Sequence, residues 1–210
     1  GTAAFFGAWL ASLLIFAPHP SSLPAADPFR ITPLIPFFFA ASSATVLAAL
    51  WRSSSLRRAL AAVPLAALNA VHTWRLLGMV FVLLYTEGQL PAHFALPAGW
   101  GDVAIGVTAP LVAFALARGV RGATTMAVSW NVLGLLDLAV AVGMGTGLLA
   151  PLLPLDLGPR VPPAAAMGVL PMILVPGFAV PLAVLMHLLA LRGLLRWTRL
   201  SPGTLAVETR

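Results

Sequence analysis

The chain has 210 residues, of which 60% are hydrophobic and only 9% are charged, and its formal net charge is +6. A soluble core could not absorb this composition, so we expect the chain to lie in a lipid bilayer. The chain has no cysteine, which excludes disulfides, cysteine-ligated metal clusters and thiol nucleophiles. The arginines lie at the ends of apolar blocks rather than in one patch, so we expect membrane lipids and no nucleic acid as partners.

A helix needs roughly 20 mainly apolar residues to cross the hydrocarbon layer of a membrane. Six apolar blocks divide this chain, at residues 3–17, 33–51, 66–85, 103–117, 125–145 and 167–191. The sequence therefore predicts an all-α fold, in which six transmembrane helices form a single bundle over residues 1–210.

Two segments depart from this simple pattern. The last block holds Pro171, Pro176 and Pro181, and a proline inside a helix removes a backbone hydrogen bond. We therefore expect the sixth span to be kinked or partly unwound. Residues 56–65 precede the third block, and we expect them to lie at the membrane interface.

Arginines alternate between the connections of the predicted bundle. The second connection, the fourth connection and the C-terminal tail carry three, two and four arginines, whereas the first, third and fifth carry one, none and one. Because positive residues are retained on the cytoplasmic side, this pattern predicts that both termini are cytoplasmic. We expect the protein in the inner membrane of a bacterium.

Two opposite charges occur in the middle of predicted spans. Arg75 lies in the third span and Asp137 in the fifth, at similar depth. Charges at membrane depth are costly and usually have a partner, so we expect an Arg75–Asp137 ion pair. Asn69, His72 and Asn131 are expected to support this pair. The pair either fixes the register of the helices or serves as a proton relay or substrate contact.

A short motif precedes the fourth predicted span. Gly99-Trp100-Gly101-Asp102 contains the Gly-x-Gly-Asp signature of intramembrane aspartyl proteases, in which a second aspartate shares a proton with the first. In those proteases the second aspartate precedes the motif, whereas Asp137 follows it and lies deeper. We therefore expect Asp102 to cap the N-terminus of the fourth span, where a carboxylate is stabilised.

Two histidines lie within the predicted spans. His72 and His187 are each expected near the cytoplasmic side, where they could ligate a haem or a pigment as a histidine pair. Bound lipid is the other cofactor that we consider, and we predict no metal site.

Three parts of the chain together resemble a known pattern. Arg75, the segment LPAHFALPAGWGD (residues 90–102) and the segment WNVLGLLD (residues 130–137) resemble a pattern in uncharacterised bacterial multi-span membrane proteins. The resemblance implies a multi-span membrane fold, and it implies no activity.

The connections are short and the chain completes no enzyme motif, since the second protease aspartate is not in its usual place, so we expect no enzyme. Our first hypothesis is a non-catalytic accessory subunit, packed against other transmembrane subunits of a photosynthetic or respiratory complex. The alternative is a small-solute or proton-coupled transporter that uses Arg75 and Asp137. Haem or pigment binding and aspartyl proteolysis are further alternatives. Water access to Asp137 separates the first two hypotheses, because a dry, paired aspartate favours a structural role.

Overall fold

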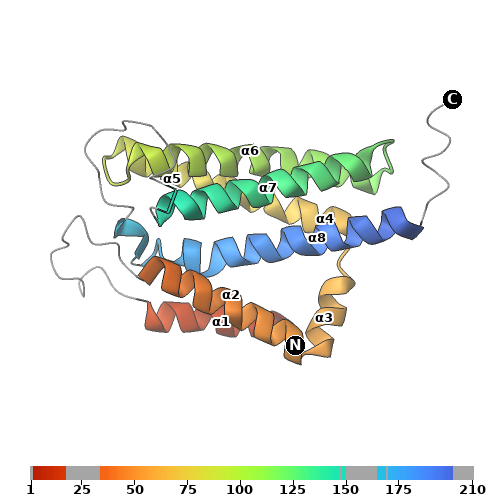
Figure 1. Cartoon of the computed structure of the whole chain (residues 1–210), viewed down its shortest axis with the longest axis horizontal. Helices are drawn as coiled ribbons and strands as arrows, with labels where there is room; N and C mark the ends of the chain where they lie inside the picture. The colour runs from red at the N-terminus through yellow and green to blue at the C-terminus, as the bar shows by residue number, and fades with distance from the viewer. Residues whose placement is uncertain (1, 18–33, 147, 150–164, 169, 201–210) are drawn as a thin grey trace.

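The structure is a computed structural model that describes residues 2–17, 34–146, 148–149, 165–168 and 170–200. All regular structure in these residues is helical (Figure 1). The elements are α1 (Thr2–Phe16), α2 (Leu34–Arg52), α3 (Ser54–Ala61), α4 (Leu65–Ala70), the 3-10 helix η2 (Val71–Gly78), α5 (Met79–Thr86), α6 (Ala92–Ala117), α7 (Ala123–Gly145), the 3-10 turn η4 (Ala165–Gly168), the π-helix η5 (Val175–Ala179) and α8 (Val180–Leu200).

Five segments are long and apolar enough to cross a membrane. They are Ile35–Arg52, Leu65–Thr86, Ala92–Ala117, Ala123–Gly145 and Val175–Arg196. The first expected span corresponds to α1, an apolar helix of 15 residues. Large apolar side chains such as Phe37 and Leu111 are exposed on the outside of the bundle, where lipid rather than water would suit them. By length and composition, the chain is a multi-pass helical membrane protein.

Two predicted span boundaries were wrong. The fourth span does not begin at residue 103, because α6 begins at Ala92 and continues through Pro97. Residues 92–102, which contain proline and glycine, were expected in the connection before this span. In a bilayer, a helix persists through such residues because unpaired backbone groups are costlier there than in water. The sixth span begins at Val175 rather than residue 167, and its first turns form the π-helix η5 around Pro176.

The third expected span is continuous but changes its geometry. It runs from α4 through η2 to α5, so its middle is a 3-10 helix rather than an α-helix. A 3-10 stretch inside a longer helix is uncommon and often marks a functional hinge.

The helix α6 is the centre of the packing. It contacts η2, α4, α5 and α7, while α4 and α7 also contact α8. Figure 1 shows α6 and α7 along one edge of the bundle, α8 across the middle, and α1 with α2 along the opposite edge. The helices α1 and α2 pack on η5, where the rings of Trp9 and Phe178 have centroids 4.6 Å apart.

One end of the bundle carries the arginines of the connections. In Figure 1, α2, α6 and α8 end at the right, where α3 and the start of α7 also lie. The arginines of these elements and their turns include Arg52, Arg57, Arg58, Arg118, Arg121, Arg192, Arg196 and Arg199. The short helix α3 is amphipathic, since Leu56 and Leu60 are buried while Arg57 and Arg58 are exposed. Such an amphipathic pattern is typical of helices at a membrane interface, which is the position predicted for residues 56–65.

Candidate functional site

Arg75 lies in the middle of the span Leu65–Thr86, on η2, and its side chain is fully buried. In a 3-10 helix, side chains three residues apart eclipse one another. His72, Arg75 and Gly78 therefore share one edge of η2, and Asn69 precedes them by the same step on α4. All four residues are buried, so this edge faces the interior of the bundle.

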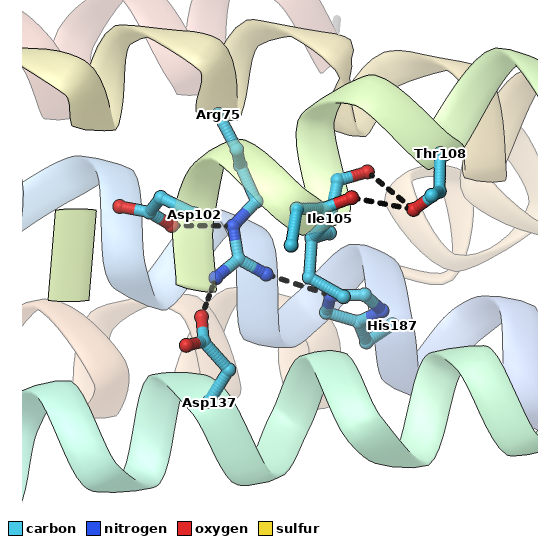
Figure 2. A network of polar contacts seen from close by, with 7 residues as sticks. Arg75, Asp102, Ile105, Thr108, Asp137 and His187 are labelled. Carbon is cyan, nitrogen blue, oxygen red and sulfur yellow. Dashed lines mark hydrogen bonds and ion pairs between the residues drawn. The ribbon is translucent and has the colours of Figure 1, made fainter. Parts of the chain in front are cut away.

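The guanidinium of Arg75 binds a partner on each of three other helices (Figure 2). Its Nε donates to Asp102 Oδ1 on α6 at 2.6 Å. Its Nη2 donates to Asp137 Oδ2 on α7. Its Nη1 lies 3.3 Å from His187 Nε2 on α8. The predicted Arg75–Asp137 pair is confirmed, and the same cation ties η2 to α6, α7 and α8.

The prediction that Asp102 caps a helix was wrong. Since α6 begins at Ala92 and has Pro91 at its N-cap, Asp102 lies well inside the helix. There it reaches the depth of Arg75 and becomes its second carboxylate partner. Reading residues 92–117 as one helix would have revealed this partner, because Asp102 and Arg75 then fall in the middle of adjacent spans.

Glycines make room for the polar side chains. A Cβ atom added at Gly78 would overlap the side chain of Asp102, and one at Gly101 would overlap the carboxylate of Asp137. A Cβ atom at Gly134 would overlap the ring of His187. Because a glycine inside a helix costs about 1 kcal/mol relative to alanine, these positions are best explained by the close approach that the network needs.

His187 continues the network away from Arg75. A guanidinium can only donate, so His187 Nε2 accepts and its proton must reside on Nδ1. That Nδ1 donates to Asn131 Oδ1 at 2.8 Å. The amide of Asn131 donates to Asn69 Oδ1 at 2.8 Å and to a backbone carbonyl one turn earlier on α7. The amide of Asn69 donates to a backbone carbonyl one turn earlier on α4. His187 is therefore a neutral imidazole in a chain of hydrogen bonds that runs in one direction.

His72 lies against His187 without hydrogen bonds. The two rings are stacked, with centroids 3.8 Å apart and planes inclined by 18°. Neither ring nitrogen of His72 has a hydrogen-bond partner, although the side chain is fully buried. The ring of Trp130 lies at an angle to both, with its centroid 5.6 Å from that of His72 and 5.5 Å from that of His187, and its Nε1 donates to Thr108 Oγ1.

This stacking does not fit the expected histidine pair on a haem or pigment. Two axial ligands approach a metal from opposite faces of the macrocycle, whereas the His72 and His187 rings touch and leave no space between them. Both nitrogens of His187 are also engaged. Within the described part of the chain, no group of three or more histidine, aspartate or glutamate residues is placed to hold a metal ion.

The two aspartates do not form a protease dyad. Asp102 and Asp137 bind different nitrogens of Arg75, so a cation takes the place of the shared proton and the attacking water. The Gly-x-Gly-Asp motif therefore serves another purpose here: Gly101 admits the carboxylate of Asp137, while Asp102 binds Arg75.

A cavity of about 40 Å³ adjoins the network. It lies between α2, α5, α6, α7 and the η5 segment, and Asp102 is the charged residue in its lining. Its other lining residues are mainly apolar and include Phe39, Phe81, Phe94 and Thr146. The side chain of Asp102 is 17% exposed, whereas that of Arg75 is not exposed at all. Asp102 thus connects the buried network to a space that can hold a few water molecules.

The structure is a helical bundle whose helices are long and apolar enough to cross a membrane several times, and it holds a buried charged network beside a cavity. A family model described as a domain of unknown function (DUF8737) matches residues 32–195, and the chain belongs to this family. The match includes every residue of the network and leaves α1 outside it. No curated protein and no solved structure matches the chain.

Proposed function

We propose that this protein is a small-solute transporter whose central site is Arg75 with Asp102 and Asp137. The observation that carries this proposal concerns Asp102 rather than Asp137, the residue expected to decide between the hypotheses. Asp102 binds the buried Arg75 and also lines a cavity, whereas Asp137 is paired with Arg75 and is not among the lining residues. Ionisable groups inside a membrane usually mark a substrate or ion pathway. A pair that only fixed helix register would gain nothing from an adjoining cavity, because water or solute there weakens its attraction.

The backbone beside the site supports the same proposal. Two of the described spans depart from α-helical geometry, at η2 and at η5. The first carries Arg75, and the second contributes Val175 and Pro176 to the cavity. Transporters commonly form their sites from interrupted helices, and π-helical or 3-10 segments inside longer helices often lie at functional sites.

The charges of the site suit coupling to protons. Arg75 supplies one positive charge, while Asp102 and Asp137 supply two negative charges when both are ionised. A surplus charge at this depth is costly, so either a proton or a solute must balance it. A transporter that exchanges a bound proton for a bound solute at this site would couple the movement of the solute to the movement of protons.

We place six spans in a bacterial inner membrane, with α1 as the first span and both termini in the cytoplasm. The arginine-rich end of the bundle supports this orientation, since it would face the cytoplasm. The cavity lies toward the other end, near the start of α6 and the end of α7, and would therefore face the periplasm.

The accessory role in a photosynthetic or respiratory complex stays a prediction. The apolar outer surface suits lipid as well as a partner subunit. Mass spectrometry of proteins that co-purify in mild detergent tests it: stoichiometric recovery with subunits of such a complex would favour that role over transport.

Transport is tested in liposomes loaded with a pH-sensitive dye. A pH gradient is imposed, and an amine, a carboxylate or a neutral polyol is added in separate runs. We expect at least one solute class to drive a proton flux, which Asp102→Asn abolishes. Glu87→Gln is the matched control, because Glu87 is an exposed carboxylate after α5, outside the network. If no class drives a flux through folded wild-type protein, the proposal is wrong.

A further inference from the structure

We infer that the cavity beside Asp102 binds a small alkylammonium ion, and that this ion replaces a proton that Asp102 carries when the cavity is empty. The inference names the substrate class of the proposed transporter and in that sense rests on the proposed function. It is carried by three features of the structure: the charge of the network, the chemistry of the cavity wall and the size of the cavity.

The network has one negative charge more than it can balance when both aspartates are ionised. Arg75 shares its single charge between Asp102 and Asp137. His187 is neutral because it accepts from Arg75 at one nitrogen and donates from the other. His72 has no acceptor at either nitrogen, so a charged imidazole there would bury two unpaired N–H groups. The histidines therefore supply no compensating charge.

The surplus charge faces the cavity through Asp102. Only Oδ1 of this residue binds Arg75, and Figure 2 shows the second oxygen directed away from the guanidinium. Each helix that packs around Asp102 contributes groups to its surroundings. Arg75 faces it from η2, Thr146 lines the cavity from α7, and Asp137 on α7 is near enough for its like charge to act on Asp102. His187 binds the same guanidinium from α8. The lining residues of α2 and α5 are apolar.

The wall of the cavity favours an organic cation over other ligands. Phe39, Phe81 and Phe94 line it together with aliphatic side chains, and aromatic rings are apolar groups that attract cations. A metal cation such as Ca²⁺ would need several oxygen ligands, and the described lining offers chiefly Asp102 and Thr146. An anion would be repelled by Asp102, and a neutral solute would leave the surplus charge in place.

The size of the cavity limits the ligand to a few non-hydrogen atoms. A volume of about 40 Å³ corresponds to a few water molecules, which is the scale of methylammonium to tetramethylammonium. In the exchange, the O–H bond of the Asp102 carboxyl group breaks and the proton passes to water. The carboxylate that remains faces the ammonium ion, so the charge of the site is the same before and after exchange.

The test uses the purified full chain in detergent and isothermal titration calorimetry with tetramethylammonium chloride. Tert-butanol is the neutral analogue of similar size, and sodium acetate is the anionic comparison. We expect saturable binding of tetramethylammonium alone, with release of one proton per ion in a weakly buffered solution that contains a pH indicator. Affinity should rise with pH by up to about tenfold per unit, because binding and protonation compete.

Three variants make the test specific. Asp102→Asn should weaken tetramethylammonium binding by about tenfold or more and abolish proton release. Ala141→Phe fills the cavity and leaves every charged residue in place, since Ala141 lines it, and should also abolish binding. Val140→Phe makes the same change at an adjacent residue that is 42% exposed, and should bind like wild type. Size-exclusion chromatography confirms that each variant is folded.

Several outcomes would overturn the inference: no tetramethylammonium binding to wild type, equal binding of tert-butanol, binding without proton release, or unchanged binding in Ala141→Phe. Its failure is separable from failure of the proposed function. If carboxylates drive a proton flux in liposomes but no ammonium ion binds, the proposal of transport holds and the inference of an alkylammonium site is wrong. If ammonium ions bind but no solute drives a flux in liposomes, the inference of an alkylammonium site holds and the proposal of transport is wrong.

Discussion

The stacked rings of His72 and His187 have opposite hydrogen-bonding states. Their centroids are 3.8 Å apart, yet His187 uses both nitrogens within the network, and neither nitrogen of His72 has a partner. Two residues of the same type in direct contact therefore contribute differently to stability. His187 links Arg75 to Asn131, whereas His72 contributes only its ring to the packing.

This difference predicts opposite effects of the same substitution. His72→Phe keeps the stacking and removes a buried polar group that has no hydrogen-bond partner. Leaving such a group buried typically costs about 1–3 kcal/mol, so the variant should be as stable as the wild type or more stable. His187→Phe leaves Arg75 Nη1 and Asn131 Oδ1 without this partner and should destabilise the fold by about 2–3 kcal/mol. Thermal unfolding followed by circular dichroism in detergent measures both. A larger loss in His72→Phe than in His187→Phe would contradict the hydrogen-bond assignment.

A second prediction concerns the charge balance around Arg75. Arg75→Leu strands Asp102 and Asp137 without their cation, and removing one partner of a buried ion pair costs about 3–5 kcal/mol. The triple variant Arg75→Leu, Asp102→Asn, Asp137→Asn removes all three charges and should recover most of that loss. The free energy of unfolding of both variants gives the comparison. If the triple variant were no more stable than Arg75→Leu, the loss would come from packing rather than from charge.

A third prediction concerns the glycines of the site. Gly101→Ala places a methyl group on the carboxylate of Asp137 and should destabilise the protein by about 1–3 kcal/mol, as overpacking does. Gly7→Ala is the control, because Gly7 lies in α1 with no atom within 4 Å of an added Cβ. This control should be neutral or slightly stabilising, since alanine favours a helix. Equal unfolding midpoints for the two variants would show that Gly101 has no special role.

The sequence alone predicted the central ion pair because two opposite charges lay at similar depth in separate spans. It also placed Asn69 and His72 on the same edge as Arg75, since steps of three residues share a face in either type of helix. Their expected support of the pair is indirect, because hydrogen bonds connect Asn69 to Arg75 through Asn131 and His187, and His72 forms none. It did not reveal the 3-10 geometry of η2, because that spacing is compatible with an α-helix as well. The partners of Arg75 depend on which spans lie side by side, and no local pattern contains that information.

Asp102 was misassigned for a different physical reason. Pro97, Gly99 and Gly101 break helices in water, where the backbone can bond to solvent instead. In a bilayer the backbone must satisfy itself, and α6 runs through all three residues. His187 was misassigned because its depth suited a cofactor ligand, while its bonds to Arg75 and Asn131 depend on the packing of α8 against α7.

The last prediction concerns the orientation in the membrane. Because the chain has no cysteine, single cysteines can be placed at exposed positions without removing native ones. Ser54→Cys and Val120→Cys lie at the arginine-rich end, and Gln89→Cys lies between α5 and α6 at the other end. With a membrane-impermeant maleimide on bacterial spheroplasts, Gln89→Cys should react at once, whereas the other two should react only after permeabilisation, since arginine-rich connections stay in the cytoplasm. The reverse pattern would turn the cavity toward the cytoplasm, and solutes would then enter it from that side.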